Sequence, residues 1–165
     1  MLKALSLPRP EFVDVLRRYG AAPVEDMEAL GRRIVFRILT SNTDDHLRNH
    51  AFLYEGQNGW RLSPAYDLNP VPIDIKPRVL VTAIIEGDNT ASLALAFQVA
   101  GYFEISTTRA REIAAEVAAV VSTWRAQAKR RGLSRREIDS HGLCLSSIAI
   151  SKSPGAVDIA GSRDE

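Results

Sequence analysis

The chain has 165 residues, of which 45% are hydrophobic and 25% charged, and its formal net charge is +1. This length predicts one domain with a sizeable core, and the nearly neutral charge gives no global electrostatic reason to expect nucleic acid or an acidic partner. One cysteine, Cys144, excludes an internal disulfide. The N-terminus lacks the apolar segment of a secretory signal, and no apolar run reaches the roughly 18 residues of a membrane span. We therefore expect a cytoplasmic globular protein without a membrane partner.

Two helices are predicted before residue 40. In residues 10–19, Phe12, Val15 and Leu16 share one face, and Gly20 provides a C-terminal stop. The second helix is predicted from about residue 24 to residue 39. Its first turn is acidic, which suits the helix dipole, and an apolar stripe at spacings of three and four follows at Met27, Leu30, Ile34 and Ile38.

A polar segment and a β-hairpin are expected next. Residues 41–54 read SNTDDHLRNHAFLY, a dense polar stretch between two apolar runs. The runs AFLYEG and WRLSPAYD stand on either side of QNG, which predicts a hairpin with its turn at Asn58 and Gly59. The following LNPVPIDIKP has three prolines and is incompatible with regular structure, whereas VLVTAII fits either a strand or a buried segment.

The rest of the chain is predicted to be helical. A helix over residues 91–103 would be capped by Asp88, Asn89 or Thr90, and a short helix over 134–145 would begin with a capping box. Between them, a long helix is expected from a cap at residues 106–108 to about residue 131, with an apolar stripe of Ile113, Val117, Val120, Val121 and Trp124. The predicted fold class is mainly α with a small β-hairpin.

Three residues of the polar segment and the hairpin suggest phosphoryl-transfer chemistry. Asn49 follows Asp44 by five residues, and Asp67 stands at the end of the second predicted strand. If the hairpin folds back, Asp67 returns to the neighbourhood of Asn49. Two carboxylates and an amide oxygen are hard ligands that suit Mg²⁺. The order of the groups is also that of the catalytic and metal loops of protein kinases: an Asp, an Asn five residues later, a hairpin and a second Asp.

The two motifs NTDDHLRN and LSPAYDL resemble those of the HipA family of bacterial Ser/Thr kinases, the toxins of toxin–antitoxin pairs. In that family a TDxHxxN loop and an L(S/T)PxYD segment frame the active site. The matching residues are Thr43, Asp44, His46, Asn49, Leu62, Ser63, Pro64, Tyr66 and Asp67. The resemblance covers roughly residues 5–145 and implies the C-terminal, catalytic-loop lobe of a kinase-like fold over residues 1–150, with 151–165 as a tail.

The resemblance also implies roles for these residues. Asp44 would be the catalytic base, with His46 supporting its loop, and Asn49 and Asp67 would hold Mg²⁺ and thereby ATP. The implied partners are a DNA-binding antitoxin of the HipB type and a protein substrate, for which aminoacyl-tRNA synthetases are the family's example. The role of Arg48 stays open.

The sequence departs from a complete kinase before Asp44. It has no GxGxxG phosphate loop, and Lys3 is the only lysine that precedes the motif. We therefore expect an isolated C-terminal lobe, either a piece or a shortened gene product, that binds ATP poorly and has no kinase activity by itself.

Other residues receive structural interpretations. Asp45 and His50 are expected to be bystanders, Tyr66 to orient Asp67, and both tryptophans, Trp60 and Trp124, to anchor the core. Residues 125–136 hold six basic side chains and no acidic one, which fits a solvated helix end or a surface for phosphates. A non-catalytic interaction module and a metal-dependent phosphohydrolase are the alternative functions.

Overall fold

The computed structural model describes residues 9–44, 46–69, 80–81, 84 and 88–139. Within them the chain is mainly helical with one two-stranded antiparallel sheet, which confirms this part of the predicted fold class. In chain order the elements are α1 (Arg9–Tyr19), α2 (Pro23–Leu39), a 3₁₀ helix (Leu47–Asn49), β1 (Phe52–Tyr54), a 3₁₀ helix (Gly56–Asn58), β2 (Trp60–Leu62), α3 (Leu93–Gln98), a 3₁₀ helix (Ala100–Phe103), α4 (Thr107–Ser122) and α5 (Trp124–Arg130).

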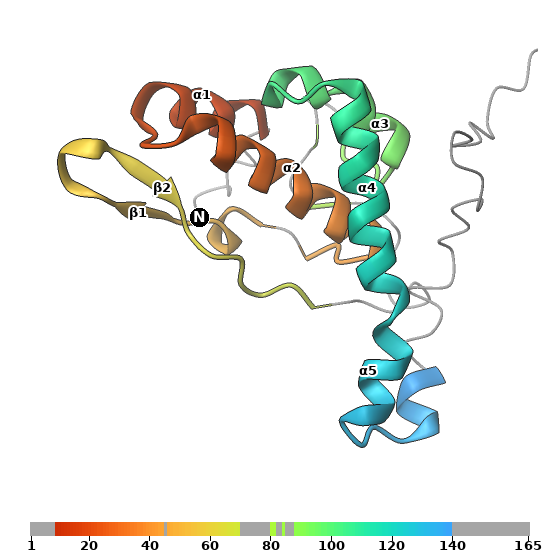
Figure 1. Ribbon diagram of the computed structural model, residues 1–165. Coiled ribbons are helices and arrows are strands. Elements are labelled where there is room, and N and C mark those ends of the chain that lie inside the picture. The colour runs from red at the N-terminus through yellow and green to blue at the C-terminus, as the bar shows by residue number, and fades with distance from the viewer. Residues whose placement is uncertain (1–8, 45, 70–79, 82–83, 85–87, 140–165) are drawn as a thin grey trace, which may run out of the picture.

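The helix α2 is the centre of the molecule. It contacts α1, β2, α3 and α4 (Figure 1), and it carries the predicted apolar stripe, in which Met27 and Leu30 are fully buried. Proline at the first helical position suits its N-terminus, since the missing N–H has no partner there in any helix. The stripe packs against buried residues of α4 such as Ile113 and Val117 to form the core. Burial on several sides explains why so many α2 side chains are apolar.

The hairpin forms at the predicted place, but its strands are shorter and its turn is longer than predicted. The second strand ends at Leu62, so Asp67 lies five residues beyond it and not at its end, which corrects that prediction. Phe52 pairs with Leu62 and Tyr54 with Trp60, and a short 3₁₀ helix occupies the connection. Glu55 N donates to Gly59 O at 2.8 Å, and Gly59 has a φ of +104°, which glycine adopts without strain. Trp60 is 41% exposed, so its prediction as a core anchor is wrong. Its ring instead lies beside that of Tyr54 on the exposed face of the hairpin.

The helix predicted over residues 91–103 is divided in the structure. Ser92, rather than Asp88, Asn89 or Thr90, is the N-cap of α3, and its Oγ accepts from Leu95 N. The Asp88 carboxylate instead accepts from Thr90 N at 2.8 Å and closes a local turn. The α-helix ends at Gln98, and a 3₁₀ helix continues the chain to Phe103.

The long helix predicted to reach residue 131 is two helices, α4 and α5. Ser106 caps α4 as predicted, since its Oγ accepts from Arg109 N at 3.1 Å. At the break, Ser122 Oγ and Thr123 Oγ1 donate to carbonyls three residues earlier, an alternative to helical pairing. Val120 is 70% exposed and is not part of the buried stripe, which corrects that prediction. Trp124 is half-buried at the start of α5 and outside the core, so its prediction as part of the stripe and as a core anchor is wrong as well.

Towards the end of the described chain, Ser134 and Glu137 form the predicted capping box. Glu137 Oε2 accepts from Ser134 N at 2.8 Å, Ser134 Oγ accepts from Glu137 N at 3.3 Å, and residues 135–139 are helical. Leu80 and Ile84 are buried, as a buried segment would require. Predictions for Lys3, Asp45, Cys144, residues 70–77 and the tail 151–165 lie outside the described residues. No helix in the described ranges is both long and apolar enough to cross a bilayer.

Candidate functional site

The first loop of the site begins where α2 ends. Thr40 N and Oγ1 both donate to Phe36 O at 2.9 Å, which closes the last helical turn. Ser41 has a φ of +52°, so the backbone turns sharply there, and Asn42 N donates back to Arg37 O at 2.9 Å. Residues 40–43 are buried although all four are polar. This anchored turn fixes the direction in which the chain enters the TDxHxxN motif.

The motif closes on itself through Asn49. The Asn49 side chain is 3% exposed, and its Nδ2 donates to Asp44 O at 2.9 Å. Its backbone N–H donates to His46 O, also at 2.9 Å, in the 3₁₀ turn. The Asp44 side chain is exposed. The five-residue interval therefore buries the amide beneath the loop and leaves the carboxylate facing outwards.

The hairpin brings the second segment back to this loop. Ser63 N donates to Ala51 O at 2.9 Å, which continues the strand pairing one step beyond β2. Tyr66 Oη then donates to Arg48 O at 2.7 Å, and Asn42 Nδ2 donates to Asp67 O at 3.4 Å. The loops of Asp44 and Asp67 are thus joined by hydrogen bonds across 25 residues of sequence. The proposed roles of Asp44, His46, Asn49 and Asp67 stay predictions.

Asp67 has an unusual backbone for a residue with a side chain. Its φ is +54°, in the left-handed region that Asp and Asn tolerate better than most residues. Asn69 Nδ2 donates to Asp67 Oδ1 at 2.9 Å, and the Asp67 side chain is exposed. The turn therefore leaves the Asp67 carboxylate facing the solvent, as a group that binds a ligand from solution must.

Two arginines of α2 lie behind the site, and the sequence analysis missed both. Arg37 is 1% exposed, and burial together with the charge of Arg33 lowers its pKa to about 10, while Asp67 and Tyr66 oppose the shift. The Arg33 guanidinium donates to Ser63 O, and burial lowers its pKa as well. The sequence signal that could have revealed them is their spacing of four residues, since each arginine directly precedes an isoleucine of the apolar stripe. Both place positive charge near the Asp67 segment.

The two histidines of the motif lie in different surroundings. His50 packs against Phe12, with ring centroids 5.2 Å apart. Burial, followed by the charges of Arg37, Arg33 and His46, lowers the pKa of His50 to about 4, so the ring is neutral at pH 7. His46 is partly buried, and its Nδ1 has no hydrogen-bond partner among the described residues. The structure therefore supports a packing role for His50.

The site has the composition of an oxygen-ligand site. Among the described residues, no cluster of three or more His, Cys, Asp or Glu side chains could hold a metal. What the two loops provide is two exposed carboxylates, Asp44 and Asp67, and the amide of Asn49. Asn49 Nδ2 donates to Asp44 O, and within the described chain no hydrogen bond ends on Asn49 Oδ1. This donor set suits a hard cation better than zinc.

Comparison with known proteins identifies the family. The model of the HipA-like C-terminal domain matches residues 8–124, more than half of the chain. Comparisons with curated proteins and with solved structures gave no significant match. The matched region contains α1 to α4, the hairpin and both loops of the site. The chain therefore belongs to the HipA-like C-terminal domain family.

Proposed function

We propose that the chain is the catalytic-loop lobe of a HipA-like serine/threonine protein kinase with a kinase-like fold. In this role Asp44 accepts the proton of a substrate hydroxyl, and Asn49 and Asp67 hold the metal. His46 supports the loop between them. The single observation that carries the proposal is the hydrogen bond from Asn42 to Asp67 O, because it joins the two motif loops that a kinase needs side by side.

The local geometry supports different roles for the side chains of Asp44, Asn49 and Asp67. Asp44 and Asp67 are exposed and can reach solvent-borne ligands, whereas Asn49 is buried and fixed by Asp44 O. Asn69 holds one Asp67 oxygen, which leaves Oδ2 for a cation. When bound, Mg²⁺ with ATP supplies the phosphoryl group and neutralises its charge. The chain's own residues then orient the acceptor hydroxyl and take its proton.

The metal role is tested in the longest natural polypeptide that contains this chain. We expect Asp67→Ala to weaken Mg²⁺–nucleotide binding in calorimetric titrations by about tenfold or more, since a charged ligand is lost. Asp67→Gly separates the carboxylate from the backbone, because glycine adopts positive φ freely. Asp88→Ala is the matched control, an exposed loop carboxylate outside the site. Binding that is unchanged in both Asp67 variants would exclude the metal role.

The catalytic role has a separate test. Asp44→Asn keeps the size of the side chain and leaves the Asn49 bond, which uses the backbone carbonyl of Asp44, in place. We expect it to abolish phosphotransfer to a protein hydroxyl while Mg²⁺–nucleotide binding persists. For the 165-residue chain by itself we propose no activity, as no GxGxxG loop is present in its sequence. Phosphotransfer by the purified chain would contradict that part.

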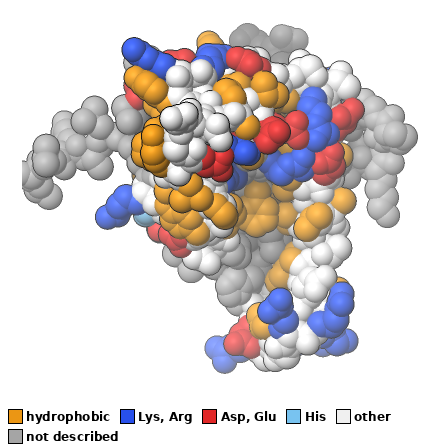
Figure 2. Space-filling model, turned by 60° about the vertical axis from the view of Figure 1, so that its left-hand side comes forward, with side chains coloured by type: hydrophobic (Ala, Val, Ile, Leu, Met, Phe, Trp, Pro, Cys, Tyr) orange, Lys and Arg blue, Asp and Glu red, His pale blue; other side chains and the backbone are white. Residues whose placement is uncertain are grey.

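A non-catalytic interaction module is the second candidate, and α5 favours it. This helix extends from the body of the molecule (Figure 1) and buries none of its described residues. Basic side chains predominate at that end in Figure 2, and four of them, Lys129, Arg130, Arg131 and Arg136, have no acidic partner among the described residues.

The partner in this second function is an antitoxin of the HipB type or the DNA it occupies, and the kinase function adds a protein substrate such as an aminoacyl-tRNA synthetase. We expect Lys129→Glu with Arg130→Glu to weaken a phosphate-mediated complex, and its affinity to fall steeply with salt. Unchanged binding in this double variant would exclude α5 as the interface. Absence of phosphotransfer by the longest natural polypeptide that contains this chain, with the complex at α5 retained, would favour this second candidate over the first.

A further inference from the structure

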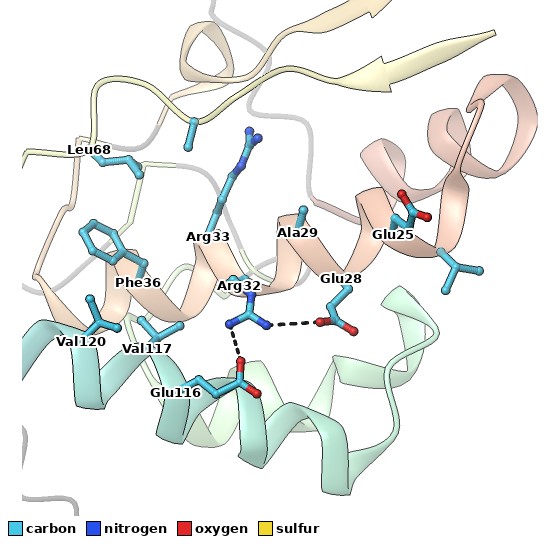
Figure 3. A pocket seen from close by; sticks show the side chains of 12 residues that line it. Glu25, Glu28, Ala29, Arg32, Arg33, Phe36, Leu68, Glu116, Val117 and Val120 are labelled. Carbon is cyan, nitrogen blue, oxygen red and sulfur yellow. Dashed lines mark hydrogen bonds and ion pairs between the residues drawn. The ribbon is translucent and has the colours of Figure 1, made fainter. Parts of the chain in front are cut away.

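An open apolar groove, the α2–α4 groove, lies between α2, α4 and the segment after β2. Its volume is about 810 Å³, enough for several side chains. Phe36, Leu68, Val117 and Val120 line it, and Figure 3 shows these side chains converging from the two helices and the segment. Val120 is 70% exposed, and Val24, which also lines the groove, is 66% exposed. Apolar surface that gathers in this way is typical of a place where another segment packs.

The carboxylates on the rim of the groove are already paired with cations. Arg32 Nη1 lies 2.6 Å from Glu116 Oε2, and the same guanidinium reaches Glu28, as the dashed lines of Figure 3 show. Glu25 Oε2 lies 3.1 Å from Arg61 Nη2. Every carboxylate among the described lining residues therefore has a cation, so the groove suits an occupant without charge.

Beyond α5 the chain reverses and returns towards this groove. α5 leads away from the body of the molecule, and Gly132, with a φ of +81°, lies at the turn that follows it (Figure 1). Residues 135–139 are helical, and Asp139 Oδ1 lies 3.5 Å from Nη1 of Arg125, in the first turn of α5. Arg125 follows Val120 by five residues, about 8 Å along a helix. The chain after Asp139 therefore begins close to the Val120 end of the groove.

The residues that follow have the composition of a buried segment. Residues 143–150 read LCLSSIAI, in which six of eight side chains are hydrophobic and none is charged. From Asp139 to Leu143 an extended chain reaches up to about 14 Å, which is enough to enter the groove beside Val120. Eight extended residues reach about 27 Å, whereas the lining residues Val24 and Phe36 are about 18 Å apart along α2. The run is therefore long enough to follow the groove.

We propose that residues 143–150 dock in the α2–α4 groove of the same chain. Docking covers the exposed valines of the groove with apolar side chains and leaves the ion pairs of the rim in place. Residues 1–8 are also rich in leucine, but Lys3 would find no unpaired carboxylate among the described lining residues. The inference does not depend on the proposed kinase function, because it uses neither Mg²⁺ nor nucleotide.

The test uses Cys144, the only cysteine of the chain. Val120→Cys places a second thiol at the end of the groove where the segment enters. Ala119→Cys is the matched control, because Ala119 is exposed, does not line the groove and is almost equally far from Cys144 in sequence. Both 165-residue variants are treated with oxidised glutathione at low protein concentration, and the disulfide is followed by mass spectrometry. We expect it to form within one chain about tenfold faster in Val120→Cys, because docking holds the two thiols near bonding distance.

Glutamates in the segment provide a second test in the Val120→Cys chain. Leu145→Glu with Ile148→Glu places charges where the groove is apolar and should slow the cross-link to the rate of Ala119→Cys. Val157→Glu with Ile159→Glu adds the same charges outside the segment and should leave the rate unchanged. The proposal is overturned if Val120→Cys links no faster than the control, if the disulfide joins two chains, or if the two glutamate pairs have equal effects.

Discussion

Asp26 is a carboxylate whose partners come from another element. From its position in the first turn of α2 it was interpreted only as a group that suits the helix dipole, yet it is 3% exposed. Its Oδ2 accepts from Arg61 Nε at 3.0 Å and from Leu62 N at 2.9 Å, so it fastens β2 to α2. The hairpin that carries Asp67 back to the loop therefore depends on this residue.

We predict that Asp26→Ala lowers the free energy of unfolding by about 2–4 kcal/mol, because it leaves a buried N–H of β2 without an acceptor and Arg61 without its partner. Glu25→Ala removes a neighbouring carboxylate with 74% of its side chain exposed, and it should change stability by less than about 1 kcal/mol. Urea denaturation of both variants measures the difference. Equal losses in the two variants would show that the buried bonds contribute no more than the exposed pair.

His50 should make the fold sensitive to acid. Its pKa is lowered from 6.5 to about 4 in the folded protein, so above pH 6.5 the ring is neutral in both states and its full contribution to stability is present. As the pH falls from 6.5 to about 4, the unfolded state takes up the proton first and stability is lost, by up to about 3 kcal/mol. His50→Asn, which has no ring to protonate, should lose less stability over this interval in urea titrations at several pH values. Parallel losses in wild type and variant would contradict the prediction.

Individual residues differ in how far the sequence reveals them. Asp44, Asn49 and Asp67 could be selected because their spacing follows the requirements of one reaction. Asn42 and Arg37 could not, since their contribution depends on where a turn and a helix place them after folding. Asn42 reads as an ordinary polar loop residue, but it is 1% exposed and joins the two loops. The residues proposed to carry out chemistry were thus easier to find than those that position them.

At the scale of elements, the contact of α2 with the segment before α4 is very close at one glycine. A Cβ atom on Gly31 would lie 2.7 Å from Ile105 Cδ1, the end of a flexible side chain. Gly31→Ala therefore combines a gain in helix propensity of about 1 kcal/mol with a steric cost of similar size, and we predict little net change in stability.

A double-mutant cycle separates these two contributions. Ile105→Val removes the Cδ1 atom, so Gly31→Ala in that background should stabilise the protein by about 1 kcal/mol relative to Ile105→Val alone. Thermal unfolding of the four proteins gives the coupling. If Gly31→Ala has the same effect in both backgrounds, the close contact does not limit the packing of α2.

Periodicity predicted the helices well and their interruptions poorly. The bounds of α1 and α2 lie within one residue of the predicted ones, because a glycine, a proline and a clear apolar stripe mark them. The predicted helix through residue 131 breaks at Thr123, where hydroxyl groups bond to carbonyls of the preceding turn. The apolar pattern continues in sequence across that point, so it carries no sign of the break. The two hydroxyl bonds that accompany the break appear only in the folded chain.

At the scale of the whole molecule, charge and core are separated in space. The net charge of +1 conceals a basic end, since residues 125–136 carry six cations and no acidic residue. The buried residues of the described chain end with Val121, at the last turns of α4. The overall composition therefore described the average of two unlike regions, a core around α2 and an exposed basic helix.

This separation predicts unequal protection against hydrogen exchange. Nine residues of α2 are buried, whereas none of the described residues of α5 is. Amides of α2 should exchange only through global unfolding, and those of α5 should exchange through local opening at a much lower free energy.

Exchange measured residue by residue by NMR at several urea concentrations distinguishes the two, because local opening depends little on urea and global unfolding depends strongly on it. α4 is the internal control, as its buried face should follow α2. If α5 amides exchanged as slowly as those of α2, with the same dependence on urea, α5 would be part of the cooperative core and not a separately opening surface for a partner.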